Sequence, residues 1–104
     1  MSIGQEFVAL KKAYKAKTMA FLGHVSTLQR LERAMDILTR DSIYSWVRVS
    51  AGRYLIQNLE SAVEYSVDTV AKTCTCPDHE NGNICKHRLA CELLDAVKKE
   101  IGEE

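Results

Sequence analysis

Residues 74–87 hold most of the soft metal-binding donors of this chain. The stretch, CTCPDHENGNICKH, contains three of the four cysteines and two of the three histidines found in 104 residues. A chain of this length has room for one domain with a modest core, and the least regular part of a small domain often depends on a disulfide or a metal ion for its stability. The cluster therefore constrains the possible folds more than any other feature of the sequence.

The rest of the sequence favours reduced thiols. No apolar run approaches the roughly 20 residues of a membrane span, and residues 1–10 lack the basic start and apolar stretch of a secretory signal. We therefore expect a cytoplasmic, intracellular protein without membrane association. Thiols stay reduced in these compartments, so clustered cysteines are interpreted as metal ligands before disulfides.

The first two cysteines have a spacing that suits one metal ion. On an extended strand, residues two apart point to the same face, so Cys74 and Cys76 can present both sulfurs to one ion. Pro77 ends such a strand, and the polar residues 78–83 can form a loop that folds back over the ion. The sequence therefore predicts a strand that delivers two ligands, followed by a loop.

Cys85 and His87 form the second pair of donors. On a continuous helix they would diverge by about 200°, so Cys85 should lie before or at the start of a helix, with His87 in its first turn. Three thiolates and one imidazole make a closed tetrahedral set, which suits a structural Zn²⁺ ion and leaves no position for a catalytic water. The predicted zinc ligands are Cys74, Cys76, Cys85 and His87.

Other roles for these donors stay open at this point. His79 lies inside the loop and could replace His87 as a ligand, although a solvated loop histidine is the simpler interpretation. Cys91 could reach the ion if the last helix began early, but a small core residue is the simpler interpretation. A disulfide between Cys74 and Cys76 would close a very tight ring. Cysteine–histidine catalysis lacks a recognisable orienting residue or oxyanion-hole motif.

Two helices are predicted before the cluster. Residues 5–22 and a segment that Ser26 or Thr27 can cap carry apolar side chains at helical spacing, and residues 41–42 mark the end of the second helix. The break at residues 23–24 predicts a helical hairpin, with one long bent helix as the alternative. The apolar positions are Phe7, Leu10, Tyr14 and Phe21 in the first helix and Leu28, Leu31, Met35 and Leu38 in the second.

Strands and a last helix are predicted after residue 43. Residues 44–49 and 53–59 are rich in β-branched and aromatic side chains and flank a short turn, which predicts a hairpin. Residues 63–67 alternate as in a half-buried strand, and residues 72–76 form the next strand. The last helix should end before Gly102. Its buried stripe is predicted to be Leu89, Ala90, Leu93, Leu94, Val97 and Ile101.

These elements predict an α+β fold: an N-terminal helical hairpin, a small antiparallel β-sheet, a zinc knuckle and a C-terminal helix. Residues 1–42 would be a basic helical extension and residues 43–104 the zinc-binding unit. Residues 1–40 hold seven Lys and Arg against three acidic residues, a net of +4, so the remainder carries −4 in a chain without net charge. A polyanion should therefore meet the N-terminal part first.

The pattern Cys-x-Cys, eight residues, Cys-x-His, in the contexts CTCPD and CKHRLA, resembles the SWIM zinc finger. The likeness extends upstream through WVRV and YLI and covers roughly residues 44–94. It implies a small β-sheet that leads into a zinc knuckle and a helix, with zinc bound by the four predicted ligands, and it identifies residues 43–104 as the finger. Two positions depart from the family pattern: His79 follows the Pro-Asp pair, where an aromatic or apolar residue is common, and Cys91 stands where the helix is usually apolar.

The resemblance also suggests a function. SWIM domains occur in Mutator-like transposases, helicase-like ATPases and recombination-mediator proteins, and are regarded as DNA-binding or protein-binding modules without an activity of their own. The chain has no Walker loop and no recognisable nuclease carboxylates, so we expect a non-enzyme that binds nucleic acid, with DNA favoured, as an accessory factor. The candidate contacts are Lys11, Lys12, Lys15, Arg48, Arg53, Lys86 and Arg88. A DNA-bound protein would lie in the nucleoid or the nucleus.

Two further expectations concern strength and partners. Zinc with three thiolates contributes a charge of about −1, and phosphate binding needs several neutralising contacts at physiological salt, so weak or auxiliary DNA binding is expected. The alternative function is a protein-protein interaction adaptor, for example in a recombination or transposition complex. In that case the apolar stripes of the N-terminal helices would bind a partner or a second copy, unless they cover the sheet.

Overall fold

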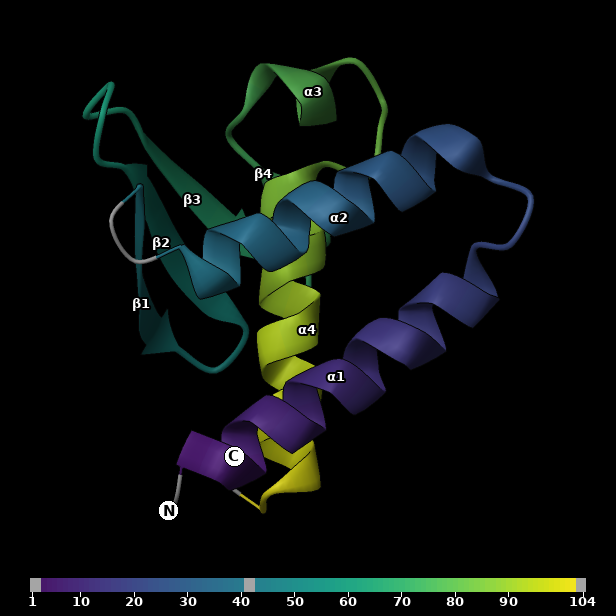
Figure 1. Ribbon diagram of the computed structural model, residues 1–104. Helices are drawn as coiled ribbons and strands as arrows, with labels where there is room; N and C mark the ends of the chain where they lie inside the picture. Colours follow the sequence, from purple (N-terminus) through teal and green to yellow (C-terminus); the bar gives the residue numbers. More distant parts are fainter. Residues whose placement is uncertain (1–2, 41–42, 103–104) are drawn as a thin grey trace.

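The computed structural model describes residues 3–40 and 43–102, and these residues form the α+β fold that the sequence predicts. Figure 1 shows a helical hairpin, a sheet, a short helical turn at the knuckle and a long last helix. The elements in chain order are α1 (Ile3–Ala20), α2 (Val25–Thr39), β1 (Tyr44–Ser50), β2 (Arg53–Asn58), β3 (Glu64–Asp68), β4 (Thr73–Cys74), α3 (Pro77–Glu80) and α4 (Lys86–Glu100).

The predicted helical hairpin is present, and the alternative of one long bent helix is wrong. The chain turns at Gly23, whose φ of +88° lies in the left-handed region that glycine adopts without strain. The predicted cap at Ser26 or Thr27 is also wrong, because both residues lie inside α2 and His24 occupies the N-cap position without a side-chain hydrogen bond. The end predicted at residues 41–42 lies outside the described residues, and α2 itself ends at Thr39.

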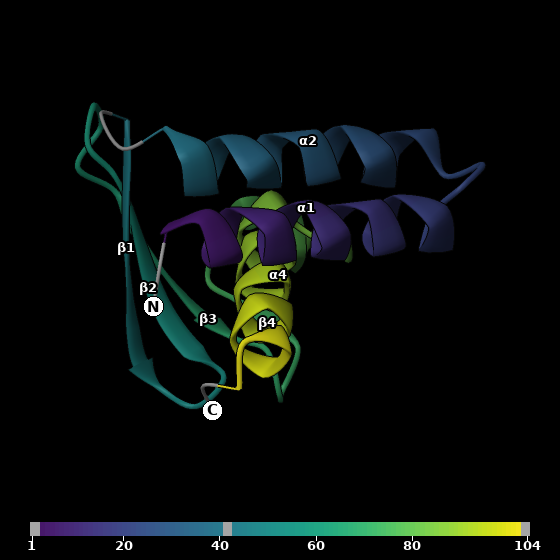
Figure 2. The same cartoon turned by 60° about the horizontal axis from the view of Figure 1, so that its bottom comes forward.

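The last helix is the element on which the others pack. In Figures 1 and 2, α1 and α2 run side by side and both cross α4, while the sheet lies along another side of α4. Seven residues of α4 are buried, among them the predicted stripe from Leu89 to Val97. Gly102 follows the helix with a φ of +79°, as expected of a residue just past a helix end. The apolar stripes of the hairpin therefore cover α4 more than they cover the sheet.

Small residues set how closely the hairpin approaches α4. Ala9 and Ala34 are buried, although the sequence pattern drew attention only to the larger apolar side chains. Leu31 and Ile37 complete the buried face of α2, whereas Phe7 at the start of the α1 stripe keeps half of its surface exposed. Alanine at a helix crossing lets the backbones come close, which is why these positions belong to the core.

The four strands form an antiparallel sheet in the order β1-β2-β3-β4. Tyr54 pairs with Val67 and Ile56 pairs with Tyr65, and these side chains form the inner face of the sheet. The predicted alternation holds for Tyr65 and Val67, but Val63 precedes the strand and is exposed. The last strand is shorter than predicted, because the ladder ends at Cys74.

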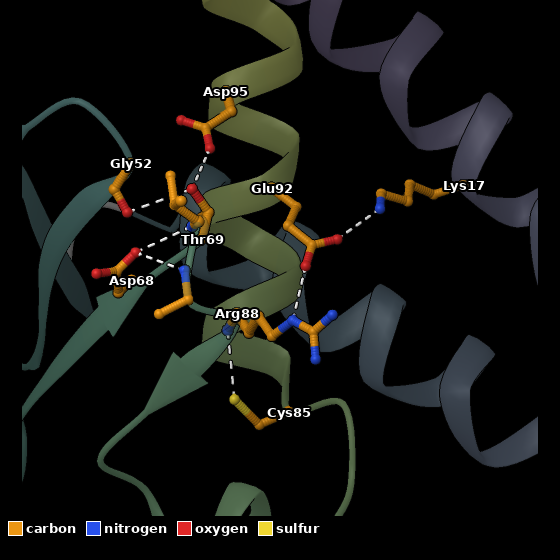
Figure 3. Close-up of polar contacts among 10 residues, drawn as sticks. Lys17, Gly52, Asp68, Thr69, Cys85, Arg88, Glu92 and Asp95 are labelled. Carbon is orange, nitrogen blue, oxygen red and sulfur yellow. Dashed lines mark hydrogen bonds and ion pairs between the residues drawn. The ribbon is translucent and has the colours of Figure 1, made fainter.

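A partly buried carboxylate fastens α4 to the sheet. Asp95 accepts a hydrogen bond of 2.5 Å from the hydroxyl of Tyr54 and another of 2.5 Å from the hydroxyl of Thr69; Figure 3 shows the second. Burial, together with the hydrogen bond to Asp95, raises the pKa of Tyr54, so this phenol stays a donor. One side chain thus joins α4 to β2 and to the turn before β4. Within the described residues, no helix combines the length and apolar character that crossing a bilayer requires.

Candidate metal centre

Four donors from three elements meet at the end of the sheet. Cys74 ends β4, Cys76 caps α3, Cys85 caps α4, and His87 lies in the first turn of α4. One donor atom from each residue lies within 4.8 Å of the others, and all four residues are buried. The structure therefore brings together the four side chains that the sequence predicts as ligands.

The backbone before the knuckle explains how the first two cysteines face one point. The N–H of Thr75 donates to the carbonyl of Ser66 at 3.1 Å, and the N–H of Ser66 donates to Oγ1 of Thr75 at 3.0 Å. These bonds turn the Thr75 side chain toward β3. Cys76 has extended dihedrals, φ −81° and ψ 157°. The alternation predicted for a strand therefore persists through Cys76, although the sheet ladder itself stops at Cys74.

Cys85 stands where the chain enters α4. Its extended dihedrals, φ −74° and ψ 161°, place it outside the helix, and its sulfur accepts a hydrogen bond of 3.3 Å from the N–H of Arg88 (Figure 3). Helix caps use this contact to satisfy one of the free N–H groups of the first turn. The prediction that Cys85 precedes the helix and that His87 lies in its first turn is confirmed.

Hydrogen bonds within the cluster shift the pKa values of its three thiols in different directions. Cys85 accepts a hydrogen bond from Cys74, which lowers its pKa to about 4 against the opposing effect of burial, and a contact with His87 adds to the lowering. The pKa of Cys74 is raised, mainly by its hydrogen bond to Cys85 and to a lesser extent by burial. Burial also raises the pKa of Cys76. Thiol ligands bind a metal as thiolates, so an ion at this site would displace the protons of the three cysteines.

The donor set fits Zn²⁺. Three cysteine sulfurs and one imidazole form a closed structural site, and the burial of all four residues keeps water away from it. His87 Nδ1 is buried and has no hydrogen-bond partner among the described residues. The ring of Tyr65 packs against the imidazole with a centroid distance of 4.4 Å and limits its rotation.

The loop over the cluster is more ordered than the sequence suggested. Residues 77–80 form the single helical turn α3, where the sequence predicted only loop. Arg30 of α2 forms a bidentate pair with Asp78, through Nε at 2.7 Å and Nη2 at 3.0 Å, and Asn83 donates to the same carboxylate at 2.9 Å. The hydrogen bond from Arg30 lowers the pKa of Asp78 despite some burial. The N-terminal hairpin therefore holds the knuckle directly, a contact that local sequence patterns do not reveal.

The alternative donors lie outside this group. Cys91 is fully buried in the core beside Leu89 and Leu93, and His79 is partly exposed on α3. Neither belongs to the set of four donors found among the described residues. All four cysteines are free, so the proposed alternative of a disulfide is wrong.

The basic residues predicted to contact nucleic acid differ in their surroundings. Arg88 donates to Glu92 at 2.7 Å and keeps only 16% of its side-chain surface exposed. Lys12 pairs with Glu100 at 2.7 Å and Arg53 with Asp68 at 3.5 Å. The other four have no ion pair within the described part of the chain: Lys11, Lys15, Arg48 and Lys86. The Lys86 ammonium lies 6.0 Å from the centre of the Tyr44 ring, and Arg48 Nε is buried without a hydrogen-bond partner among the described residues.

Comparison with known proteins agrees with the geometry. Residues 47–93 match the family model described as the SWIM zinc finger. No significant match was found among the curated proteins or among the solved structures. The matched segment runs from β1 into α4 and includes all four donors of the cluster.

Proposed function

We propose that the protein is a non-enzymatic accessory factor that binds nucleic acid, with DNA as the favoured ligand, because residues 47–93 match the family model of the SWIM zinc finger. The observation that carries the proposal is the contact between the metal centre and the basic N-terminal hairpin. A closed Cys₃His site supports one end of the molecule, and a hairpin with an excess of positive charge is fastened to that site by the Arg30–Asp78 pair.

The metal has a structural role in this proposal. When bound, zinc would hold the end of the sheet, the α3 turn and the start of α4 together, and structural zinc of this kind contributes on the order of 10 to 16 kcal/mol in small peptides. Four protein donors fill a tetrahedral shell, so the site offers no open position to a substrate. This argument supports a binding module rather than a metalloenzyme.

The exposed lysines of α1 supply the electrostatic attraction. Lys11 and Lys15 are exposed and form no ion pair within the described part of the chain, unlike Lys12. Arg88 is held by Glu92 inside the interface between α4 and the hairpin, so we do not include it among the phosphate contacts. A small number of free cations on a chain without net charge supports auxiliary rather than tight binding.

Fluorescence anisotropy with labelled duplex and single-stranded DNA tests the proposal. Zinc-loaded protein should bind saturably at low salt, and its affinity should fall steeply between low and physiological salt because phosphate contacts release counterions. The double variant Lys11→Gln and Lys15→Gln should bind more weakly and with a shallower salt dependence. The matched control, Lys98→Gln and Lys99→Gln at the C-terminal end of α4, removes the same charge. No binding at low salt, or equal losses in both variants, would contradict the proposal.

A protein-binding adaptor is the second candidate. An apolar hollow of about 420 Å³ lies where α1 and α2 meet the end of α4, and Phe7, Leu10, Leu38, Trp46 and Leu94 line it. Exposed apolar surface of this kind is typical of interaction sites. Association through this hollow, with a partner or a second copy, should be insensitive to salt, whereas DNA binding should weaken as the salt concentration rises. Sedimentation of the wild type and of Phe7→Ser at several salt concentrations detects self-association and separates the two modes.

A further inference from the structure

A continuous groove runs along α2 beside the metal centre. One hollow of about 290 Å³ borders the knuckle, and a second of about 460 Å³ lies toward the end of α2. The two hollows share five lining residues from five segments, so they adjoin each other. These residues are Arg33 of α2, Tyr44 of β1, Asn58 of β2, Ser61 of the following turn and Lys86 of α4.

The register of the sheet explains the floor of the groove. Tyr44 pairs with Asn58 and Ile56 pairs with Tyr65, and all four residues line the hollow at the knuckle. Paired residues lie on the same face of a sheet, so these side chains continue the inner face on which α4 packs. The groove is thus a part of the inner sheet surface near the N-terminal end of α4, with α2 as its wall.

Two basic side chains of the groove are available to contact an anion. Arg33 and Lys86 form no ion pair within the described residues, and each lines both hollows. Glu60 is exposed in the turn after β2 and is the one acid of the lining without an ion pair among those residues. Four other charged side chains of the groove neutralise each other in two ion pairs, Arg30–Asp78 and Arg40–Asp36. The zinc-loaded cluster, of which Cys76, Cys85 and His87 line the hollow at the knuckle, adds a charge of about −1. A phosphate would therefore depend on direct contacts with Arg33 and Lys86 and not on the net charge of the groove.

The groove also offers groups suited to a nucleobase. Tyr44 is partly exposed and lies under the Lys86 ammonium, so a flat ring can stack on it while the lysine moves to a nearby phosphate. Asn58 accepts hydrogen bonds from the N–H groups of Glu60 and Ser61 through Oδ1, which fixes its amide and leaves Nδ2 to donate to a ligand. Two cations, an aromatic ring and a fixed amide therefore line the same groove.

We infer that this groove binds a single-stranded segment of nucleic acid, with a base stacked on Tyr44 and the adjoining phosphates on Arg33 and Lys86. The inference rests on the proposed function and names its site. Stacking on an aromatic side chain requires an unpaired base, since the bases of a duplex are already stacked on one another. The protein therefore prefers single strands over duplex of the same sequence.

Anisotropy titrations of a labelled 12-nucleotide single strand and of the corresponding duplex test the inference. We use zinc-loaded wild type, Arg33→Gln, Lys86→Gln and Tyr44→Leu, with Lys99→Gln as the control for loss of one exposed charge. Far-UV circular dichroism and zinc content confirm that each variant is folded. If Tyr44→Leu fails this check, the two charge variants still decide the outcome.

The wild type should bind the single strand at least fivefold more tightly than the duplex. Tyr44→Leu should weaken single-strand binding about fivefold or more, since base stacking on one aromatic side chain is worth at least that factor. Arg33→Gln and Lys86→Gln should each lower the salt slope by about 0.7, the value for one phosphate contact of a single strand. Lys99→Gln should match the wild type.

The outcomes separate this inference from the proposed function. No binding of either DNA by the wild type contradicts both. Binding that persists in Arg33→Gln and Lys86→Gln but is lost in the double variant Lys11→Gln and Lys15→Gln would contradict binding in the groove and would support binding through the lysines of α1. Tighter binding of the duplex than of the single strand would also contradict the inference. So would an acidic peptide that competes as well as an unlabelled single strand of equal charge.

Discussion

Glu92 should be the acidic side chain on which the docking of α1 depends most. Its carboxylate accepts hydrogen bonds from Lys17 of α1 at 2.6 Å and from Arg88 of α4 at 2.7 Å (Figure 3). The side chains of Lys17, Arg88 and Glu92 are 29%, 16% and 18% exposed. Burial by itself would raise the pKa of Glu92, but the hydrogen bonds from both cations outweigh it and lower this pKa.

The cost of Glu92→Gln follows from this burial. Removing one member of a buried ion pair costs about 3 to 5 kcal/mol, because the partner is left without compensation, whereas an exposed pair contributes about 0 to 1 kcal/mol. The Glu92 network is closer to the buried limit, and glutamine keeps one acceptor oxygen. We therefore expect the free energy of unfolding to fall by about 2 to 3 kcal/mol.

Glu100→Gln is the matched control. Glu100 also lies on α4 and also pairs with a lysine of α1, Lys12, at 2.7 Å, but these side chains are 49% and 69% exposed. Removing the exposed charge should therefore cost less than about 1 kcal/mol. The two variants have the same chemistry and differ mainly in burial.

Urea unfolding of zinc-saturated protein, followed by far-UV circular dichroism, measures both changes. A lowered carboxyl pKa in the folded state gives stability that is present above the unfolded-state pKa, about 4.3 for glutamate, and is lost as the pH falls through the folded-state value. The difference between wild type and Glu92→Gln should therefore shrink at acid pH. Equal losses in Glu92→Gln and Glu100→Gln, or a difference independent of pH, would refute this reasoning.

Three other substitutions have clear expected outcomes. Cys76→Ser should lose zinc and become sensitive to proteases between residues 74 and 94, as measured by metal analysis and limited proteolysis. Cys91→Ser should keep zinc but lower the free energy of unfolding by about 1 to 3 kcal/mol, because it buries a hydroxyl in the core; metal loss equal to that of Cys76→Ser would show that Cys91 is a ligand. Gly52→Ala should lower the melting temperature more than Gly82→Ala, since both have positive φ but only at Gly52 would Cβ lie 2.9 Å from Val70 Cγ2; an equal decrease would contradict the role of this contact.

Local patterns predicted the elements and the donors but not the way in which they are held. The spacing of Cys74, Cys76, Cys85 and His87 places them on a strand end, a turn and a helix start, so chain geometry alone brings each pair together. The strand end was placed too late, at Cys76, because an extended backbone can continue where the ladder has stopped.

The contacts that position the knuckle join residues far apart in the sequence. Arg30 and Asp78 are 48 positions apart, and Lys17 and Glu92 are 75 positions apart. No local periodicity predicts such pairs, since they depend on how α1 packs on α4 and how α2 packs against the knuckle. For the same reason Ala34 was missed, because a small side chain enters the core only where helices cross.

Zinc K-edge X-ray absorption of the wild-type protein tests the central claim most directly. We expect one zinc per chain, with three sulfur neighbours at about 2.3 Å and one nitrogen neighbour at about 2.0 to 2.1 Å. This result would support the set of Cys74, Cys76, Cys85 and His87. Four sulfur neighbours would show that Cys91 replaces the histidine, two nitrogen neighbours would bring in His79, and either result would contradict the assignment.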